Sequence, residues 1–170
     1  MYQMIIGTYS KRNSRGIYLL EVDGVSRQGR IVSAIEEKNP SYLCLDPTRK
    51  RLYTALENEI GQVAVYDIGN RKAPVFIGRY KTGGGTTCHV SLSQDYRRLY
   101  ASNYEEGSIT VFEVGDSFEK SRIFYNQAKE FAQGAHAHST FSVGEDEIIC
   151  CDKGLDSILL YQGGKEMSRF

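Results

Sequence analysis

The chain has 170 residues, of which 41% are hydrophobic and 25% are charged, so its composition suits one globular domain and argues against wholesale disorder. Basic and acidic residues number 21 each, so the overall charge favours neither a nucleic acid nor an anionic membrane as partner. No apolar run approaches the roughly 20 residues of a membrane-spanning helix, and the first residues lack the features of a secretory signal. We therefore expect a cytoplasmic protein with no nucleic-acid and no membrane partner.

A repeat of 46 to 49 residues organises the chain. It recurs in the dipeptides Leu52-Tyr53, Leu99-Tyr100 and Ile148-Ile149, and in the segments that begin at Gly16, Gly61 and Gly107. Each copy holds short alternating runs rich in Val, Ile, Leu, Tyr and Phe, bounded by turn residues, which is typical of strands. A weak helical pattern falls only at 126–133.

In chain order, the pattern predicts strands near 2–8, 16–23, 31–36, 42–46, 51–57, 62–68, 74–81, 88–93, 98–104, 108–114, 121–126, 138–143, 147–152 and 157–162, with a short piece at 167–170. A period of this length with four strands predicts β-propeller blades. The expected blades are about 2–36, about 41–81, about 87–126 and about 137–170. The fold class is therefore all-β, with about three and a half four-stranded blades in one partial propeller.

The first blade has three predicted strands and lacks its innermost one. Because propellers need roughly four to eight blades around a channel, the chain forms part of a ring. Open sheet edges invite association. Either the chain is a fragment, or a second copy in a homodimer or another chain completes the ring.

The four cysteines favour a reducing compartment. Cys44, Cys88, Cys150 and Cys151 form neither a C-x-x-C pair nor a zinc-finger spacing, and the last two would face opposite sides of a strand. We expect free thiols and no metal site built on cysteine. Zinc binding by the histidines is not favoured either, and we expect no cofactor.

Several short motifs lie at the predicted inner strands and turns. They are Ile6–Tyr9 with Gly16–Tyr18, Asn39–Leu43, Cys88–Ser91, Asn103-Tyr104 with Gly107-Ser108, Gly134–Ser139 and Asp152–Asp156. Together they resemble the seven-bladed lactonase propellers, a family that includes bacterial 6-phosphogluconolactonases and fungal 3-carboxy-cis,cis-muconate lactonizing enzymes. Ala135 and Thr87 stand where the family usually has proline. The resemblance covers half of a family member and implies that the missing half supplies an arginine and a glutamate to the pocket.

Hairpin geometry selects a candidate site, because the start of one strand lies beside the end of the next. The expected pairs are His138 with Asp152, His89 with Asn103, and Ser41 or Tyr42 with Glu57. These pairs fall at one end of the channel, where binding faces of repeat folds commonly lie. His136 and His138, two residues apart, point the same way on an extended chain.

This rim has the groups that lactone hydrolysis needs: a base for water and a donor for the developing oxyanion. The pKa of an imidazole is about 6.5, so His138 can act as the base. We expect Asp152 to be its orienting carboxylate, with His136 beside it. His89, Asn103 or a backbone N–H can serve the oxyanion. We expect His89, Asn103, Glu57 and Lys153 to bind substrate, with Lys153 as the cation for a phosphate.

Several interpretations remain open. The resemblance and the rim favour hydrolysis of a small lactone or sugar phosphate, foremost 6-phosphogluconolactone. A lactonizing enzyme of the carboxymuconate type would use the same pocket. A non-catalytic half-propeller that binds a partner is the third possibility, since propellers host many functions. Each histidine would then only hold neighbouring blades in register.

Overall fold

The computed structural model describes residues 1–125 and 134–170, which form fifteen strands and no helix. The weak helical pattern at 126–133 lies outside the described residues. Short runs of β-branched and aromatic residues between turn residues account for the strands. None of the described segments forms a helix that could cross a membrane.

The strands make four antiparallel sheets, each a meander in chain order. The first sheet contains β1 (Tyr2–Gly7), β2 (Gly16–Val22) and β3 (Gly29–Glu36). The second contains β4 (Pro40–Asp46), β5 (Arg51–Leu56), β6 (Gln62–Asp67) and β7 (Val75–Lys81). The third contains β8 (Thr87–Leu92), β9 (Arg98–Asn103), β10 (Ser108–Val114) and β11 (Phe118–Tyr125). The fourth contains β12 (Ala137–Gly144), β13 (Glu147–Asp152), β14 (Ser157–Gln162) and β15 (Lys165–Arg169).

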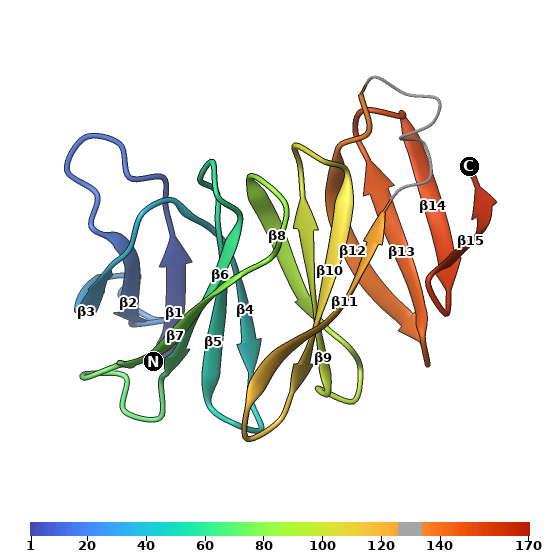
Figure 1. Ribbon diagram of the computed structural model, residues 1–170. Coiled ribbons are helices and arrows are strands. Elements are labelled where there is room, and N and C mark those ends of the chain that lie inside the picture. Colours follow the sequence, from blue (N-terminus) through green and yellow to red (C-terminus); the bar gives the residue numbers. More distant parts are fainter. Residues whose placement is uncertain (126–133) are drawn as a thin grey trace.

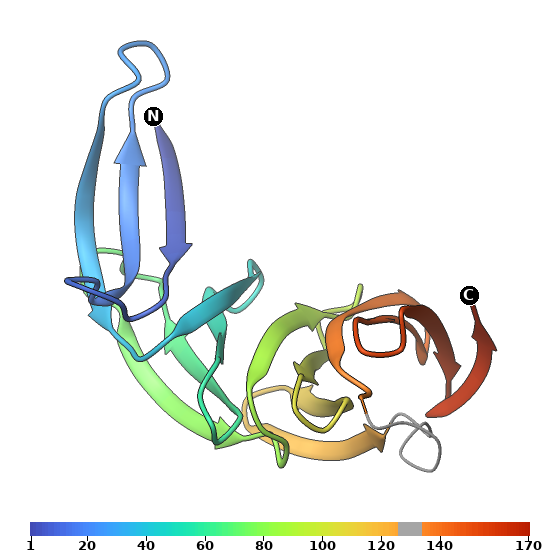
Figure 2. The same ribbon diagram turned by 90° about the horizontal axis from the view of Figure 1, so that it is seen from above.

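The sheets follow one another along an arc, with the two termini in the sheets at its ends (Figures 1 and 2). The inner strands β4, β8 and β12 contact one another in succession. The predicted partial propeller is therefore confirmed, with three four-stranded sheets and one three-stranded sheet. In the first sheet, β1 contacts β4 as β5 contacts β8, so β1 takes the place of a second strand and the innermost strand is missing. The inner strands all begin at the top of Figure 1, which we call the upper rim; the other end is the lower rim.

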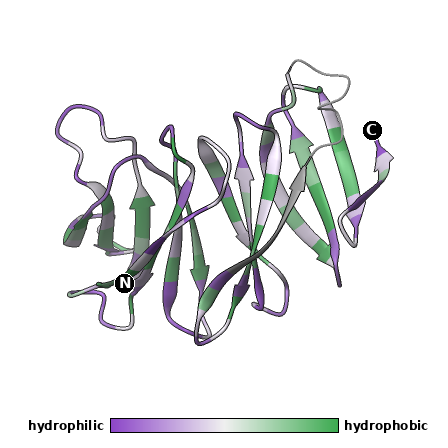
Figure 3. Ribbon diagram, in the orientation of Figure 1, coloured by the Kyte–Doolittle hydropathy of each residue, from purple (hydrophilic) through white to green (hydrophobic). Residues whose placement is uncertain are grey.

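Hydrophobic cores form between successive sheets rather than within one. Ile17 of the first sheet packs with Leu52 of the second, and Tyr53 of the second packs with Phe112 of the third. In Figure 3 the hydrophobic residues lie mainly in the strands and the hydrophilic residues mainly in the loops. A buried side chain such as Leu52 contributes roughly 2 kcal/mol, so each sheet depends on its neighbour for stability.

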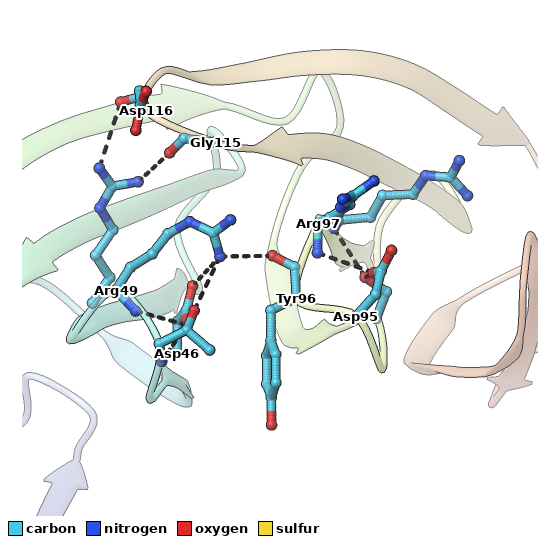
Figure 4. Close-up of polar contacts among 11 residues, drawn as sticks. Asp46, Arg49, Asp95, Tyr96, Arg97, Gly115 and Asp116 are labelled. Atoms are coloured by element: carbon cyan, nitrogen blue, oxygen red, sulfur yellow. Dashed lines mark hydrogen bonds and ion pairs between the residues drawn. The ribbon is translucent and has the colours of Figure 1, made fainter.

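Arginines join neighbouring sheets at the lower rim (Figure 4). Arg49 donates to the Asp46 carboxylate over 2.9 Å and, across the sheet boundary, to the carbonyl oxygen of Tyr96 over 3.0 Å. Arg51 donates to the carbonyl oxygen of Gly115 in the third sheet over 2.7 Å. These contacts fix the angle between sheets and so the relative position of groups at the upper rim.

Candidate active site

Each inner strand carries a β-bulge at an equivalent position near the upper rim. The extra residues are Ser41 in β4, Cys88 in β8 and His138 in β12. A bulge places two residues opposite one and redirects the side chains that follow it. The three bulges therefore decide what the inner strands present at the upper rim.

The bulges make two of the predicted pairs wrong by one residue. Ala137, not His138, lies opposite Asp152, and His138 is the unpaired residue of its bulge. His89 lies opposite Ser102. Counting back from a turn assumes one residue against one, an assumption that a bulge breaks.

A groove of about 530 Å³ opens along the fourth sheet. It is lined by His138, Cys151, Asp152, Lys153, Asp156, Ser157, Ile158 and Phe170. The structure thus brings His138, Asp152 and Lys153 together, although not in the predicted register. The His138 and Lys153 side chains are exposed, whereas Asp152 is buried at the base. An imidazole and an ammonium group in one groove can bind an anionic ligand beside a proton acceptor.

Asp152 organises the chain around the groove. One carboxylate oxygen, Oδ1, accepts hydrogen bonds from the backbone N–H groups of His136 over 2.9 Å and of Leu155 over 3.0 Å. The same carboxylate therefore holds the segment that enters β12 and the turn that follows β13.

His136 stacks on Tyr104, which enters from the third sheet. The ring centroids are 4.2 Å apart and the ring planes differ by 4°. Nδ1 of His136 lies 2.7 Å from the carbonyl oxygen of Tyr104. A carbonyl oxygen only accepts, so Nδ1 carries the proton and Nε2 of a neutral His136 is the acceptor nitrogen.

His89 is buried between aromatic side chains of the neighbouring inner strands. Its ring centroid lies 4.2 Å from that of Tyr42 and 4.9 Å from that of Phe141. Nδ1 accepts from the Thr140 N–H over 3.4 Å, and Nε2 has no hydrogen-bond partner among the residues that the structure describes. Burial and, second, the charge of a protonated His138 lower the pKa of His89 to about 4. His89 is therefore neutral at pH 7 and lies outside the groove.

Glu57 is held from the first sheet. Tyr9 donates to its carboxylate over 2.8 Å, and this hydrogen bond, followed by burial and the charge of Glu57, raises the pKa of Tyr9 to about 12. Glu57 follows the end of β5, so neither Ser41 nor Tyr42 pairs with it.

Burial, followed by the charge of Glu57, raises the pKa of Cys88 to about 12. The Cys88 thiol thus stays protonated and is no nucleophile at neutral pH.

Asn103, the last residue of β9, is buried at the upper-rim end of its strand in a polar network between strands. Its side chain is fully buried. Its Oδ1 accepts from the Thr87 hydroxyl over 2.8 Å, and its Nδ2 donates to Ser108 over 3.0 Å and to Thr110 over 2.9 Å. Both N–H groups of the amide are used and the side chain has no exposed surface, so this placement does not favour a role of Asn103 in substrate binding, which stays a prediction.

An Asn103→Leu variant is expected to lose about 2 to 4 kcal/mol of unfolding free energy, because the hydroxyls around it lose their partners while buried. Urea unfolding of the variant measures this loss. Asn13→Leu, at an exposed turn, is the matched control and should stay close to the parent. Unchanged stability with lost ligand binding would return Asn103 to the site.

Tyr104 belongs to the site but is not among the residues predicted from the sequence. Tyrosines that recur at strand positions favour a packing role, and the sequence alone does not distinguish Tyr104 from them. The repeat nevertheless contains a signal, because Glu57, Tyr104 and Lys153 each directly follow the second strand of their sheets. Equivalent repeat positions meet at one rim, so this alignment groups all three.

No cluster of three or more His, Cys, Asp or Glu side chains suited to a metal ion occurs within residues 1–125 and 134–170. The four cysteines are free, as predicted.

The sequence matches the family described as "Lactonase, 7-bladed beta-propeller" over residues 3–169. The chain belongs to this family. The resemblance seen in the motifs is thereby confirmed, and the four sheets are blades of that propeller.

Relatives of this chain include two curated proteins named 6-phosphogluconolactonase. The one from Formosa agariphila is 27% identical over 169 residues, and the one from Bacillus subtilis is 26% identical over 170 residues. The matches cover 91% and 92% of this chain but 48% of each relative. The chain spans about half the length of the curated relatives it matches.

Solved structures show the same fold. The periplasmic gluconolactonase PpgL of Pseudomonas aeruginosa matches with a TM-score of 0.83 and 24% identity, over 95% of this chain and 50% of that one. A putative 6-phosphogluconolactonase of Bacteroides fragilis matches with a TM-score of 0.81 and 24% identity, over 94% of this chain and 48% of that one. At such identities the likeness concerns the fold.

Proposed function

We propose that this chain, completed by further blades, hydrolyses a small lactone, with 6-phosphogluconolactone as substrate and 6-phosphogluconate as product. The observation that supports this function is the groove that holds His138 and Lys153 side by side. Relatives named 6-phosphogluconolactonase support the choice of substrate. A sugar phosphate needs both a cation for its phosphate and a base near its carbonyl carbon.

In the proposed reaction, water attacks the lactone carbonyl carbon while the His138 imidazole takes one of its protons. A carbon–oxygen bond forms, and the carbonyl electron pair moves onto oxygen to give a tetrahedral oxyanion. When this intermediate collapses, the ring carbon–oxygen bond breaks. The imidazolium returns the proton to the leaving alkoxide, and the open-chain acid departs.

The other groups have supporting roles in this proposal. Asp152 holds the backbone that carries His136 and His138, and His136 lies beside the base. Glu57, fixed by Tyr9, accepts hydrogen bonds from sugar hydroxyls. The oxyanion is served by a backbone N–H or by the arginine that the family resemblance implies in the remaining blades.

The assembly of the ring and the cellular compartment are part of the same proposal. The remaining blades of a longer chain, a second copy or another chain would complete the ring and the pocket. Free cysteines favour a reducing compartment such as the cytoplasm, and the balanced charge favours neither a nucleic acid nor a membrane as partner. Light scattering of the 170-residue chain distinguishes a monomer from a closed dimer.

Steady-state hydrolysis of freshly prepared 6-phosphogluconolactone and of unphosphorylated gluconolactone tests the substrate and Lys153 together. Lys153→Met should raise KM about 10-fold or more for the phosphorylated lactone, the effect of one lost charge-assisted hydrogen bond, and change KM little for the other. Lys165→Met, an exposed lysine of β15, is the control.

Two results would contradict the proposal. Equal KM changes for the two lactones would remove Lys153 from phosphate binding. A rate no higher than the uncatalysed one for both lactones, measured on an assembly in which the ring is complete, would exclude hydrolysis and favour a non-catalytic propeller that binds a partner.

A further inference from the structure

One aromatic ring touches three side chains of the candidate site. The Tyr104 ring stacks on His136 at 4.2 Å, and its centroid lies 6.1 Å from that of His138 with the planes 78° apart. Lys153 Nζ lies over the same ring, 5.6 Å from its centroid. Tyr104 therefore links the histidines of the fourth sheet with the cation of the groove.

The backbone of Tyr104 is fixed on both sides. Its N–H donates to the carbonyl oxygen of Thr86 over 3.0 Å, and its own carbonyl oxygen lies 2.7 Å from Nδ1 of His136. The turn continues through Gly107, whose φ of 62° and close approach to Ala135 leave no room for a side chain. The ring thus projects from a rigid turn of the third sheet.

The Tyr104 ring is expected to restrict Lys153 and His138 most, because both side chains are exposed. A lysine ammonium sits on a flexible four-carbon stem, and an aromatic face attracts it through the ring quadrupole. An aromatic edge or face beside an imidazole likewise favours particular ring orientations. A single rigid ring can therefore restrict both groups at once.

We propose that Tyr104 is a positioning residue, which orients the imidazoles of His136 and His138 and holds the Lys153 ammonium over its ring. This inference rests on the proposed lactone hydrolysis. The aromatic ring carries the effect, not the phenol hydroxyl, since each of the three contacts is made with the ring.

Imidazole NMR spectra test the positioning without any activity. The chain has three histidines, so single His→Gln variants assign every imidazole signal. Tyr104→Leu should move the His136 and His138 signals, because the ring current of the tyrosine is lost, and should leave the His89 signal in place. Tyr104→Phe keeps the ring and should keep the parent pattern. Tyr96→Leu removes a tyrosine ring from the lower rim and should change neither (Figure 4).

Hydrolysis rates of the same variants test the consequence. Tyr104→Leu should lower kcat/KM about 10- to 100-fold, the size of effect that misplaced reacting groups produce, and Tyr104→Phe should restore it. Unmoved histidine signals in Tyr104→Leu, or an unchanged kcat/KM in a preparation whose parent is active, would overturn the inference. A parent that is inactive although its ring is complete would instead refute the proposed function, and the imidazole signals alone would then decide whether Tyr104 positions the histidines.

Discussion

Replacing His138 by glutamine is expected to lower kcat for lactone hydrolysis about 10²- to 10⁴-fold, the range for loss of a positioned general base. Glutamine keeps a polar side chain of similar length but accepts no proton at neutral pH. Because the His138 side chain is exposed, the free energy of unfolding should change by no more than about 0.5 kcal/mol. Initial rates with fresh 6-phosphogluconolactone and urea unfolding measure the two effects separately.

His136→Gln is the matched comparison for this prediction. Nδ1 of His136 is already bound to the Tyr104 carbonyl oxygen, so we expect a smaller loss of kcat in that variant. A larger loss in His136→Gln than in His138→Gln would exchange the roles of the two histidines. Parent-like rates in both variants would remove the imidazoles from the reaction.

Acid is expected to destabilise the protein through His89 well before its carboxylates protonate. The pKa of His89 falls from an ordinary 6.5 to about 4 in the folded chain, mainly through burial. Between these values the unfolded chain binds a proton that the folded chain does not, so stability declines as pH falls from about 6.5 to about 4. The shift corresponds to about 3 kcal/mol of unfolding free energy.

The difference between parent and His89→Phe isolates this contribution. Phenylalanine keeps a planar ring between Tyr42 and Phe141 but does not titrate, so urea unfolding of the variant should lack the decline over that pH window. Tyr42→Phe retains the histidine and its aromatic neighbour and should keep the decline. A His89→Phe variant with the parent's pH dependence would show that His89 is not the group responsible.

The fold could be predicted from the sequence because the blades repeat at a fixed spacing and each strand has an alternating pattern of hydrophobic residues. The recurrence of Leu52-Tyr53 as Leu99-Tyr100 places second strands one repeat apart, and alternation within each run sets the faces that pack between sheets. The absence of the inner strand from the first blade could also be predicted, because β2 aligns with β6, which is the third strand of its sheet, whereas β2 is the second of its own. Each of these features depends on neighbours in sequence.

The site could be predicted only in part, because it depends on register and on contacts between sheets. The grouping of His138, Asp152 and Lys153 was accessible from the order of the strands. The bulge that removes His138 from pairing was not, since an unpaired residue leaves no mark in an alternating pattern. The role of Asn103 could not be decided from the sequence for another reason: a polar residue at the end of a strand can find its hydrogen-bond partners inside the sheet as well as at the rim.

The arginine contacts at the lower rim run from one sheet to the next sheet in chain order. Arg51 in the second sheet donates forward to the third, and Arg98, its counterpart, donates forward to Asp146 in the fourth over 2.8 Å. The counterpart in the fourth sheet is Glu147, which can only accept. A further blade that formed the equivalent contact on this flank would have to bring its own donor, so the polarity of the joint would reverse there.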